Sequence, residues 1–252
     1  KAATLDLLST GLRPDGMVKA ENIRVLQEVL RERGGLASQN RDKFSIAIFG
    51  EPSIDAPWAW RFEGHHLTLS YTLNGTEIVS VTPSSFSSNP NEVDSGQYAG
   101  LVALDGEQRL ARELYGDLTG SNRERALIRE RAFGNILTRA GRENLLESAP
   151  RQGVPLGDLT TSQQQLAQRL IETYAVDHLA GPLADEQRAR LAAEDRDAMT
   201  FGWAGSDQVG ETLYYRLHGD FTLIEFASLN GQPQHLHTIR HDLGHNLGQH
   251  VV

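Results

Sequence analysis

Two histidines near the end of the sequence have the spacing of a metal chelate. His235 and His237 are separated by one residue in the run Gln234-His235-Leu236-His237. Because alternate side chains of a β-strand share a face, both imidazoles are expected to point the same way. Imidazole is a common metal ligand, so two of them at this spacing can hold one ion. This pair is the strongest chemical signal in the sequence.

Three further residues can complete such a site. Glu225 lies between the apolar residues Ile224 and Phe226, on the run that precedes the two histidines. A carboxylate is costly to bury without a partner, and a shared cation would offset that cost if the two runs form a hairpin. His65 and His66 are adjacent at the end of another expected strand, so only one of them can face the ion. Histidines with one carboxylate suit a divalent transition metal, namely Cu, Fe, Mn or Zn.

Other interpretations of these histidines remain open. The polar residues can instead form a metal-free hydrogen-bonded core, or a pocket that binds a carboxylate without metal. A second metal geometry also competes, because His237, His241 and His245 are spaced by four, as on one face of a helix. Gly244 and the strand-like residues before it argue against that helix. His250 is the last of the nine histidines in the chain.

A second group of candidate residues lies in the run Tyr214-Tyr215-Arg216. On a strand, Tyr214 and Arg216 share one face, so both are candidate catalytic or substrate-orienting residues. The guanidinium can clamp a carboxylate or phosphate group. Its alternative role is a salt bridge across the sheet.

The composition and the missing motifs exclude several classes of protein. The net charge of −9 lacks the basic footprint of a nucleic-acid-binding protein. No run approaches the roughly 18 apolar residues that predict a membrane span. The chain has no cysteine, and neither a phosphate-binding loop nor a nucleophile elbow occurs, so covalent acyl chemistry has no obvious nucleophile. A small molecule is therefore the expected partner, and nothing in the pattern indicates an oligomeric state.

The first residue is Lys1, which suggests that a preceding segment such as a signal peptide was removed. An extracytoplasmic location is compatible with that interpretation. The absence of cysteine does not decide the compartment.

The elements that must position these residues fall into three groups along the chain. An N-terminal helical segment over residues 1–35 is expected to end at Gly34-Gly35. Alternating residues predict strands over 44–81, with a hairpin turn at Asn74-Gly75. Apolar residues at helical spacing predict a helical middle over 104–197, and residues 199–240 return to strand patterns.

This order predicts a single α+β domain over residues 1–252. The N-terminal and C-terminal strand groups are expected to form one mixed or antiparallel sheet, with the helical middle packed on one side of it. Ser121-Asn122 is expected to cap a helix that reaches Leu137. The Ser- and Pro-rich stretch from Pro83 to Gly96 is expected to be a long loop that covers or borders the site.

Several motifs occur in the order known from one protein family. They are Trp58-Ala-Trp-Arg-Phe-Glu-Gly-His-His-Leu67, Pro83-x-x-Phe86-x-x-x-Pro90, Phe201-x-Trp-Ala-Gly205, Tyr214-Tyr-Arg216, Leu223-Ile-Glu-Phe226 and His235-Leu-His237-Thr238. Together they resemble the bacterial and fungal domain of unknown function 3500 family (DUF3500), from about Gly34 to the C-terminus. The family usually has H-x-H-x-x-W-R-D where this chain has Arg240-His241-Asp242. The resemblance supports the set of residues and implies no particular reaction.

The expected function is that of a metal-dependent enzyme acting on a small molecule. Oxidative chemistry is slightly favoured, because no separate general base stands out for hydrolysis. The alternatives are a non-catalytic module that binds a metal or small ligand, and a metal-free carboxylate-binding pocket. An open coordination position would separate an enzyme from a purely structural metal site.

Overall fold

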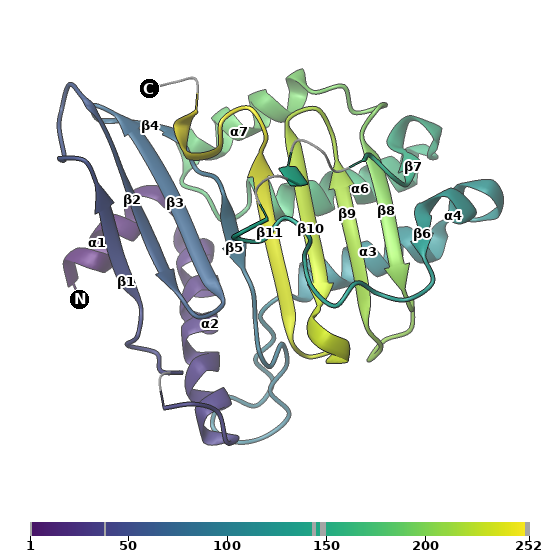
Figure 1. Ribbon diagram of the computed structural model, residues 1–252, viewed down its shortest axis with the longest axis horizontal. Coiled ribbons are helices and arrows are strands. Elements are labelled where there is room, and N and C mark those ends of the chain that lie inside the picture. The colour runs from purple at the N-terminus through teal and green to yellow at the C-terminus, as the bar shows by residue number, and fades with distance from the viewer. Residues whose placement is uncertain (1, 38, 143–144, 147–149, 250–252) are drawn as a thin grey trace.

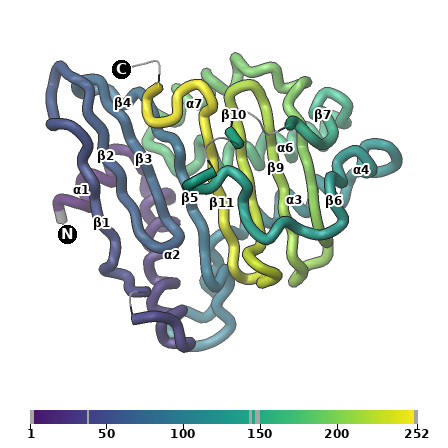
Figure 2. The backbone as a smooth tube through the Cα atoms, viewed as in Figure 1, coloured from purple at the N-terminus to yellow at the C-terminus, as the bar shows by residue number. Residues whose placement is uncertain are grey.

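A computed structural model describes the whole chain except residues 1, 38, 143–144, 147–149 and 250–252 (Figures 1 and 2). His250 therefore lies outside the described residues. None of the helices in the described part is long and apolar enough to cross a membrane.

The described strands form one mixed sheet of eleven strands. Its order is β1-β2-β3-β5-β11-β10-β9-β8-β6, with β4 paired to β3 and β7 paired to β8. The strands are β1 (Ser45–Phe49), β2 (Pro57–Gly64), β3 (Leu67–Asn74), β4 (Glu77–Ser80), β5 (Ser84–Phe86), β6 (Leu127–Arg129), β7 (Val154–Pro155), β8 (Thr200–Gly205), β9 (Leu213–His218), β10 (Thr222–Ser228) and β11 (Leu236–Asp242). Only the β6–β8 pairing is parallel among those described. The predicted α+β fold, with both strand groups in one sheet, is confirmed.

Six helices are described around this sheet. They are α1 (Ala2–Gly11), α2 (Pro14–Glu32), α3 (Asp105–Asp117), α4 (Gly120–Ala126), α6 (Thr161–Ala175) and α7 (Gly181–Ala193). Helix α2 begins at Pro14, which suits the first turn of a helix. Helix α6 begins with a capping box between Thr160 and Gln163. Figure 1 shows α2, α3, α6 and α7 behind the sheet as drawn.

The two faces of the sheet have opposite chemistry. The helix face carries apolar side chains such as Trp60, Tyr71 and Phe226, which pack in one core with leucines of α3 and α6. By strand alternation, the polar face carries Arg61 and Glu225 among others. Burial of the helix face supplies the main hydrophobic stabilisation, at roughly 1.5–3 kcal/mol per fully buried large side chain.

The stretch predicted as a long loop contains the strand that joins the two halves of the sheet. β5 pairs with β3 on one side and with β11 on the other. A bridge between Ser88 and Leu236 extends the second pairing. The loop prediction is therefore wrong for Ser84–Phe86. Residues 87–96 are irregular apart from isolated bridges, and they border the predicted histidines, because Asn89 donates to His235 at 3.2 Å. The serine-rich composition of the stretch has no strand signal of its own, and the strand forms because both neighbours offer backbone partners.

The predicted helix from Ser121 to Leu137 is also wrong beyond its first turns. Helix α4 ends at Ala126, β6 follows, and residues 130–142, here called the crossing segment, pass over the polar face (Figures 1 and 2). Ile136 packs there against Tyr214 and Ala227. These contacts on the polar face favour an irregular path over a helix, so the middle of the chain covers both sides of the sheet.

Candidate metal site

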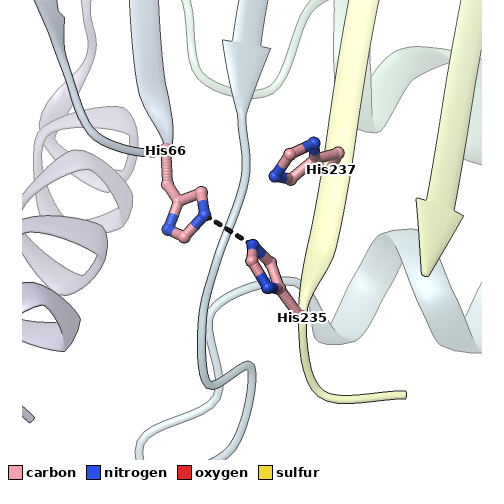
Figure 3. A group of neighbouring side chains, drawn as sticks. All are labelled: His66, His235 and His237. Carbon is pink, nitrogen blue, oxygen red and sulfur yellow. Dashed lines mark hydrogen bonds between the residues drawn. The ribbon is translucent and has the colours of Figure 1, made fainter. Parts of the chain in front are cut away.

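Three of the predicted ligands come together on the polar face. One ring nitrogen from each of His66, His235 and His237 lies within 4.8 Å of the other two (Figure 3). The ring centroids are 4.9 Å apart for His66 and His235, and 5.0 Å apart for His235 and His237. Residues distant in sequence thus form a compact three-histidine group.

The topology of the sheet explains this meeting. His237 lies on β11 and His235 directly precedes that strand, so their side chains share the polar face as predicted. His66 ends the two-residue turn between β2 and β3, with a φ of 70°. Only the narrow strand β5 and its extension separate the two segments, and the Ser87 amide donates to the His66 carbonyl at 2.7 Å. A positive φ is uncommon outside glycine, and such strained positions cluster at functional sites.

Asparagine side chains hold two of the three rings. His237 donates through Nδ1 to Oδ1 of Asn135 at 2.9 Å, which leaves its Nε2 lone pair free. Asn89 donates to Nδ1 of His235 at 3.2 Å. His235 then carries its proton on Nε2, which lies 2.9 Å from Nε2 of His66 (dashed line in Figure 3). The Nε2 proton of His235 therefore lies between the two nitrogens that a metal ion would bind.

The group is poised to be neutral at physiological pH. Burial, followed by the neighbouring histidines, lowers the pKa of His66 to about 2. Burial also lowers the pKa of His237 to about 4 and lowers that of His235. Metal ions bind the deprotonated imidazole, so no proton needs to be removed from a charged ring before binding.

His65 lies beside the group without joining it. Its ring centroid is 3.7 Å from that of His66, and its Nδ1 donates to Oε1 of Gln27 on α2 at 2.5 Å. The turn between β2 and β3 therefore directs His66, and not His65, toward the other two histidines. The sequence left these two residues as equal candidates.

Glu225 lies in a neighbouring network and does not share the three-histidine group. Its register partner on β11 is Ile239, one face position beyond His237. Its carboxylate accepts hydrogen bonds from the backbone of Leu137 at 3.0 Å, and from the backbone and hydroxyl of Thr138. The cost of burying this carboxylate is therefore met by hydrogen bonds and not by a shared cation.

Tyr214 is hydrogen-bonded to Glu225, and Arg216 lies opposite that residue in the sheet. The Tyr214 hydroxyl donates to Glu225 at 2.6 Å, and burial raises its pKa well above the usual value. Tyr214 therefore stays protonated and holds the carboxylate. Arg216 is directly opposite Glu225 in the β9–β10 register and is 2% exposed. Tyr214 packs in one cluster with Ile136 of the crossing segment, and its hydroxyl is bonded to Glu225 and not to one of the three histidines.

His241 has a role that sequence analysis left unassigned. Asn246 donates to its Nδ1 at 2.9 Å, and its Nε2 donates to the Thr138 hydroxyl at 3.1 Å. Thr138 in turn donates to Glu225, so a relay of hydrogen bonds links the C-terminal end of β11 to this carboxylate. The helical alternative for His237, His241 and His245 is wrong, because these residues lie on β11 and the turn after it.

A mixed sheet with helices on its apolar face and a three-histidine group on its polar face defines an α+β protein with a candidate metal centre. The chain belongs to the family described as protein of unknown function (DUF3500), whose model matches residues 1–248. Among curated proteins and among solved structures, no match to the chain was found.

Proposed function

We propose that this protein is a metal-dependent enzyme that acts on a small organic molecule. One divalent transition-metal ion binds to His66, His235 and His237. The observation that carries the proposal is the convergence of three ring nitrogens within 4.8 Å from two distant segments of the chain. The hydrogen bond from His237 to Asn135 supports it, because metal-bound histidines commonly donate their second nitrogen in this way.

The spacing of the nitrogens fits an ion after small shifts. Metal–nitrogen bonds of about 2.0–2.2 Å in tetrahedral geometry separate the ligand nitrogens by roughly 3.3–3.6 Å. Nε2 of His66 and Nε2 of His235 are 2.9 Å apart. Rotation of the Asn89 amide would let it accept from Nδ1 of His235 and would free Nε2 for the ion. The binding of an ion would therefore involve a flip of the Asn89 amide and a closer approach of ring nitrogens that now lie within 4.8 Å of one another.

The number of protein ligands favours catalysis over a structural role. Structural zinc sites commonly have four protein ligands, whereas catalytic sites keep a position for water or substrate. In the described part of the chain, the group contains three histidines and no carboxylate. His235 and His237 are partly exposed on the polar face, whereas His66 is buried. A metal held here would have an open coordination position.

The chemistry proposed for this ion is oxidative rather than hydrolytic. A hydrolytic site needs a group that accepts a proton from the metal-bound water, and Glu225 is already occupied by donors from Thr138 and Tyr214. Ligation by imidazole without thiolate suits Cu, Fe, Mn and Zn. Of these, the first three supply redox chemistry directly.

Metal analysis of the untagged, purified protein tests this proposal. We expect one ion per chain after incubation with the preferred metal, and loss of stoichiometric metal in His66→Ala, His235→Ala and His237→Ala. His245→Ala is the matched control, because His245 contacts Arg190 and Asp242 instead. Electron paramagnetic resonance then distinguishes copper, iron or manganese from zinc.

Two results would contradict the proposal. One is failure to retain any of the four metals at stoichiometric level. The other is equal loss of metal in the His245→Ala control and the site variants. Either result would favour a metal-free hydrogen-bonded cluster, in which His235 donates to His66.

A further inference from the structure

A cavity of about 810 Å³ opens on the polar face beside the three-histidine group. This volume lies within the roughly 300–1,000 Å³ that is typical of small-molecule sites. Strands β2, β3 and β11, the crossing segment and the turn after β11 all contribute side chains to it. Its polar lining residues include Arg61, Thr68, Ser70, Arg139, Arg151 and His218.

The cavity begins close to the histidines. Ile239 lines it and lies two residues beyond His237 on the same face of β11. Thr68 lines it from β3, two residues beyond His66. Alternate residues on one strand face are about 6.5–7 Å apart. A molecule that contacts Ile239 would therefore lie about one such spacing from His237.

The charge of the lining is positive, although the whole chain is acidic. Three arginines contribute to it, and Glu63 is the one acidic residue among the described lining residues. Arg61 lies 3.4 Å from Glu63, and Arg151 lies 2.5 Å from Asp220 outside the lining. Arg139 donates to the carbonyl of Ile136. The described lining residues thus carry a formal charge of +2 in a protein with a net charge of −9, and Arg139 is the lining arginine without an acidic neighbour in these contacts.

Buried polar atoms in the lining lack partners within the described part of the chain. They are Oγ of Ser70 and Nδ1 of His218, whose residues are 3% and 4% exposed, and Nε of Arg61. Buried polar groups are almost always hydrogen-bonded in folded proteins. Three such atoms around one cavity are therefore suited to bind the polar atoms of a ligand.

We propose that this cavity binds a small organic anion through a carboxylate or phosphate group. Arg61 and Arg139 hold the anionic group, and Ser70 and His218 supply further hydrogen bonds. Ile239 and its apolar neighbours contact the hydrocarbon part of the molecule. The cavity as an anion site is independent of the metal. The further statement that this anion is the substrate depends on the proposed function.

Calorimetric titration of the chelator-treated full chain tests the anion site. The probes are succinate and glucose 6-phosphate, with succinamide and glucose as neutral counterparts. At least one anion should bind, and its neutral counterpart should not. Arg61→Gln and Arg139→Gln should each weaken binding about tenfold, as expected for loss of one charge-assisted hydrogen bond. The preferred probe distinguishes a carboxylate from a phosphate ligand.

Two further variants sharpen the test. Glu63→Gln should strengthen binding, because it removes the acidic lining residue. Arg109→Gln is the control. Arg109 is exposed on α3, and this helix packs on the face of the sheet opposite the cavity. Thermal unfolding shows whether each variant is folded, and only folded variants enter the comparison.

Binding of neither anion at concentrations up to about 10 mM would overturn the inference. Equal weakening by Arg109→Gln and Arg139→Gln would also overturn it. The metal proposal fails or succeeds separately, because His237→Ala should retain anion binding in this metal-free titration. Absence of metal with retained anion binding would contradict the enzyme proposal alone.

Discussion

The residues that hold the histidine rings matter as much as the rings. Asn135 accepts the Nδ1 proton of His237 at 2.9 Å and so fixes the tautomer that presents Nε2. In known metal sites, loss of such an outer hydrogen bond lowers metal affinity by roughly 10–100-fold. The same side chain also accepts from the neighbouring Ile136 amide, so the bond to His237 is the one that joins the crossing segment to β11.

Replacement of Asn135 by alanine should therefore weaken metal binding by at least about tenfold while all three ligands remain. Asn135→Asp should restore affinity, because a carboxylate also accepts from Nδ1. Competition against a chromophoric chelator measures both constants. Asn122→Ala, which removes an exposed side chain bonded to the Asp158 carbonyl, is the control. Equal affinities for Asn135→Ala and the unmodified chain would show that this contact does not orient His237.

Glu225 is expected to stabilise the fold and not to bind the metal. Glu225→Gln places an NH2 group against donors from Leu137 and Thr138. We expect the free energy of unfolding to fall by about 2–3 kcal/mol, with metal content unchanged. Urea unfolding and elemental analysis of one preparation measure both. Lost metal with unchanged stability would instead support the role that the sequence suggested for this residue.

At the scale of the elements, local patterns predicted the strands in which apolar and polar residues alternate. They missed the strand that forms only because neighbouring strands pair with it. The hairpin of β2 and β3 and the strand β10 follow from alternating residues and turn signals. Strand β5 did not, because its three residues depend on β3 and β11 for pairing. The periodic apolar residues after α4 were assigned to a helix. They instead pack on the polar face of the sheet, and the sequence alone does not show that this face lies next to them.

The candidate site was also predictable only where it depends on a local pattern. The shared face of His235 and His237 follows from strand alternation alone. The choice between His65 and His66 depends on a turn with a positive φ, which neither residue type specifies. Thr138, which satisfies Glu225, is distant in sequence and carries no motif. Because the sequence did not identify Thr138 as a partner of Glu225, a metal ion was predicted in its place.

The crossing segment is an element with few apolar anchors, and Ile136 is the most buried of them. Ile136→Ala should destabilise the segment by about 2 kcal/mol. Amide hydrogen exchange over residues 130–142 should become faster, while exchange in α3 and α6 should change little. Val18→Ala on the exposed face of α2 serves as the control. Unchanged exchange over 130–142 would show that Ile136 does not hold the segment on the sheet.

At the scale of the whole molecule, the sheet separates stability from chemistry. The helix face contains the main apolar core, and the polar face buries histidines, arginines and a carboxylate under a thin cover. Burial lowers the pKa of His218, His237 and His241 to about 4 each. These groups are neutral in the folded protein at pH 7 and titrate near 6.5 when unfolded.

Acid should therefore destabilise the fold before the carboxylates titrate fully. Between pH 6.5 and 4 the unfolded chain binds more protons than the folded chain, so stability falls as the pH falls. Above pH 6.5 these histidines do not lower the free energy of unfolding. Below about pH 4 they are protonated in both states and lower it no further. For His241, which is 4% exposed, the loss should reach about 2 kcal/mol by pH 5.

His241→Gln isolates this contribution, because glutamine keeps hydrogen-bonding capacity beside Thr138 and Asn246 but does not titrate. Urea unfolding at pH 7.5 and pH 5 should show a smaller loss of stability for this variant than for the unmodified chain, even if the variant is less stable at pH 7.5. His245→Gln, at a half-exposed position on the turn after β11, should keep the full loss. Equal losses for all three proteins would mean that protonation of His241 does not oppose folding. The acid sensitivity would then have to arise from the carboxylates or from other histidines of the polar face.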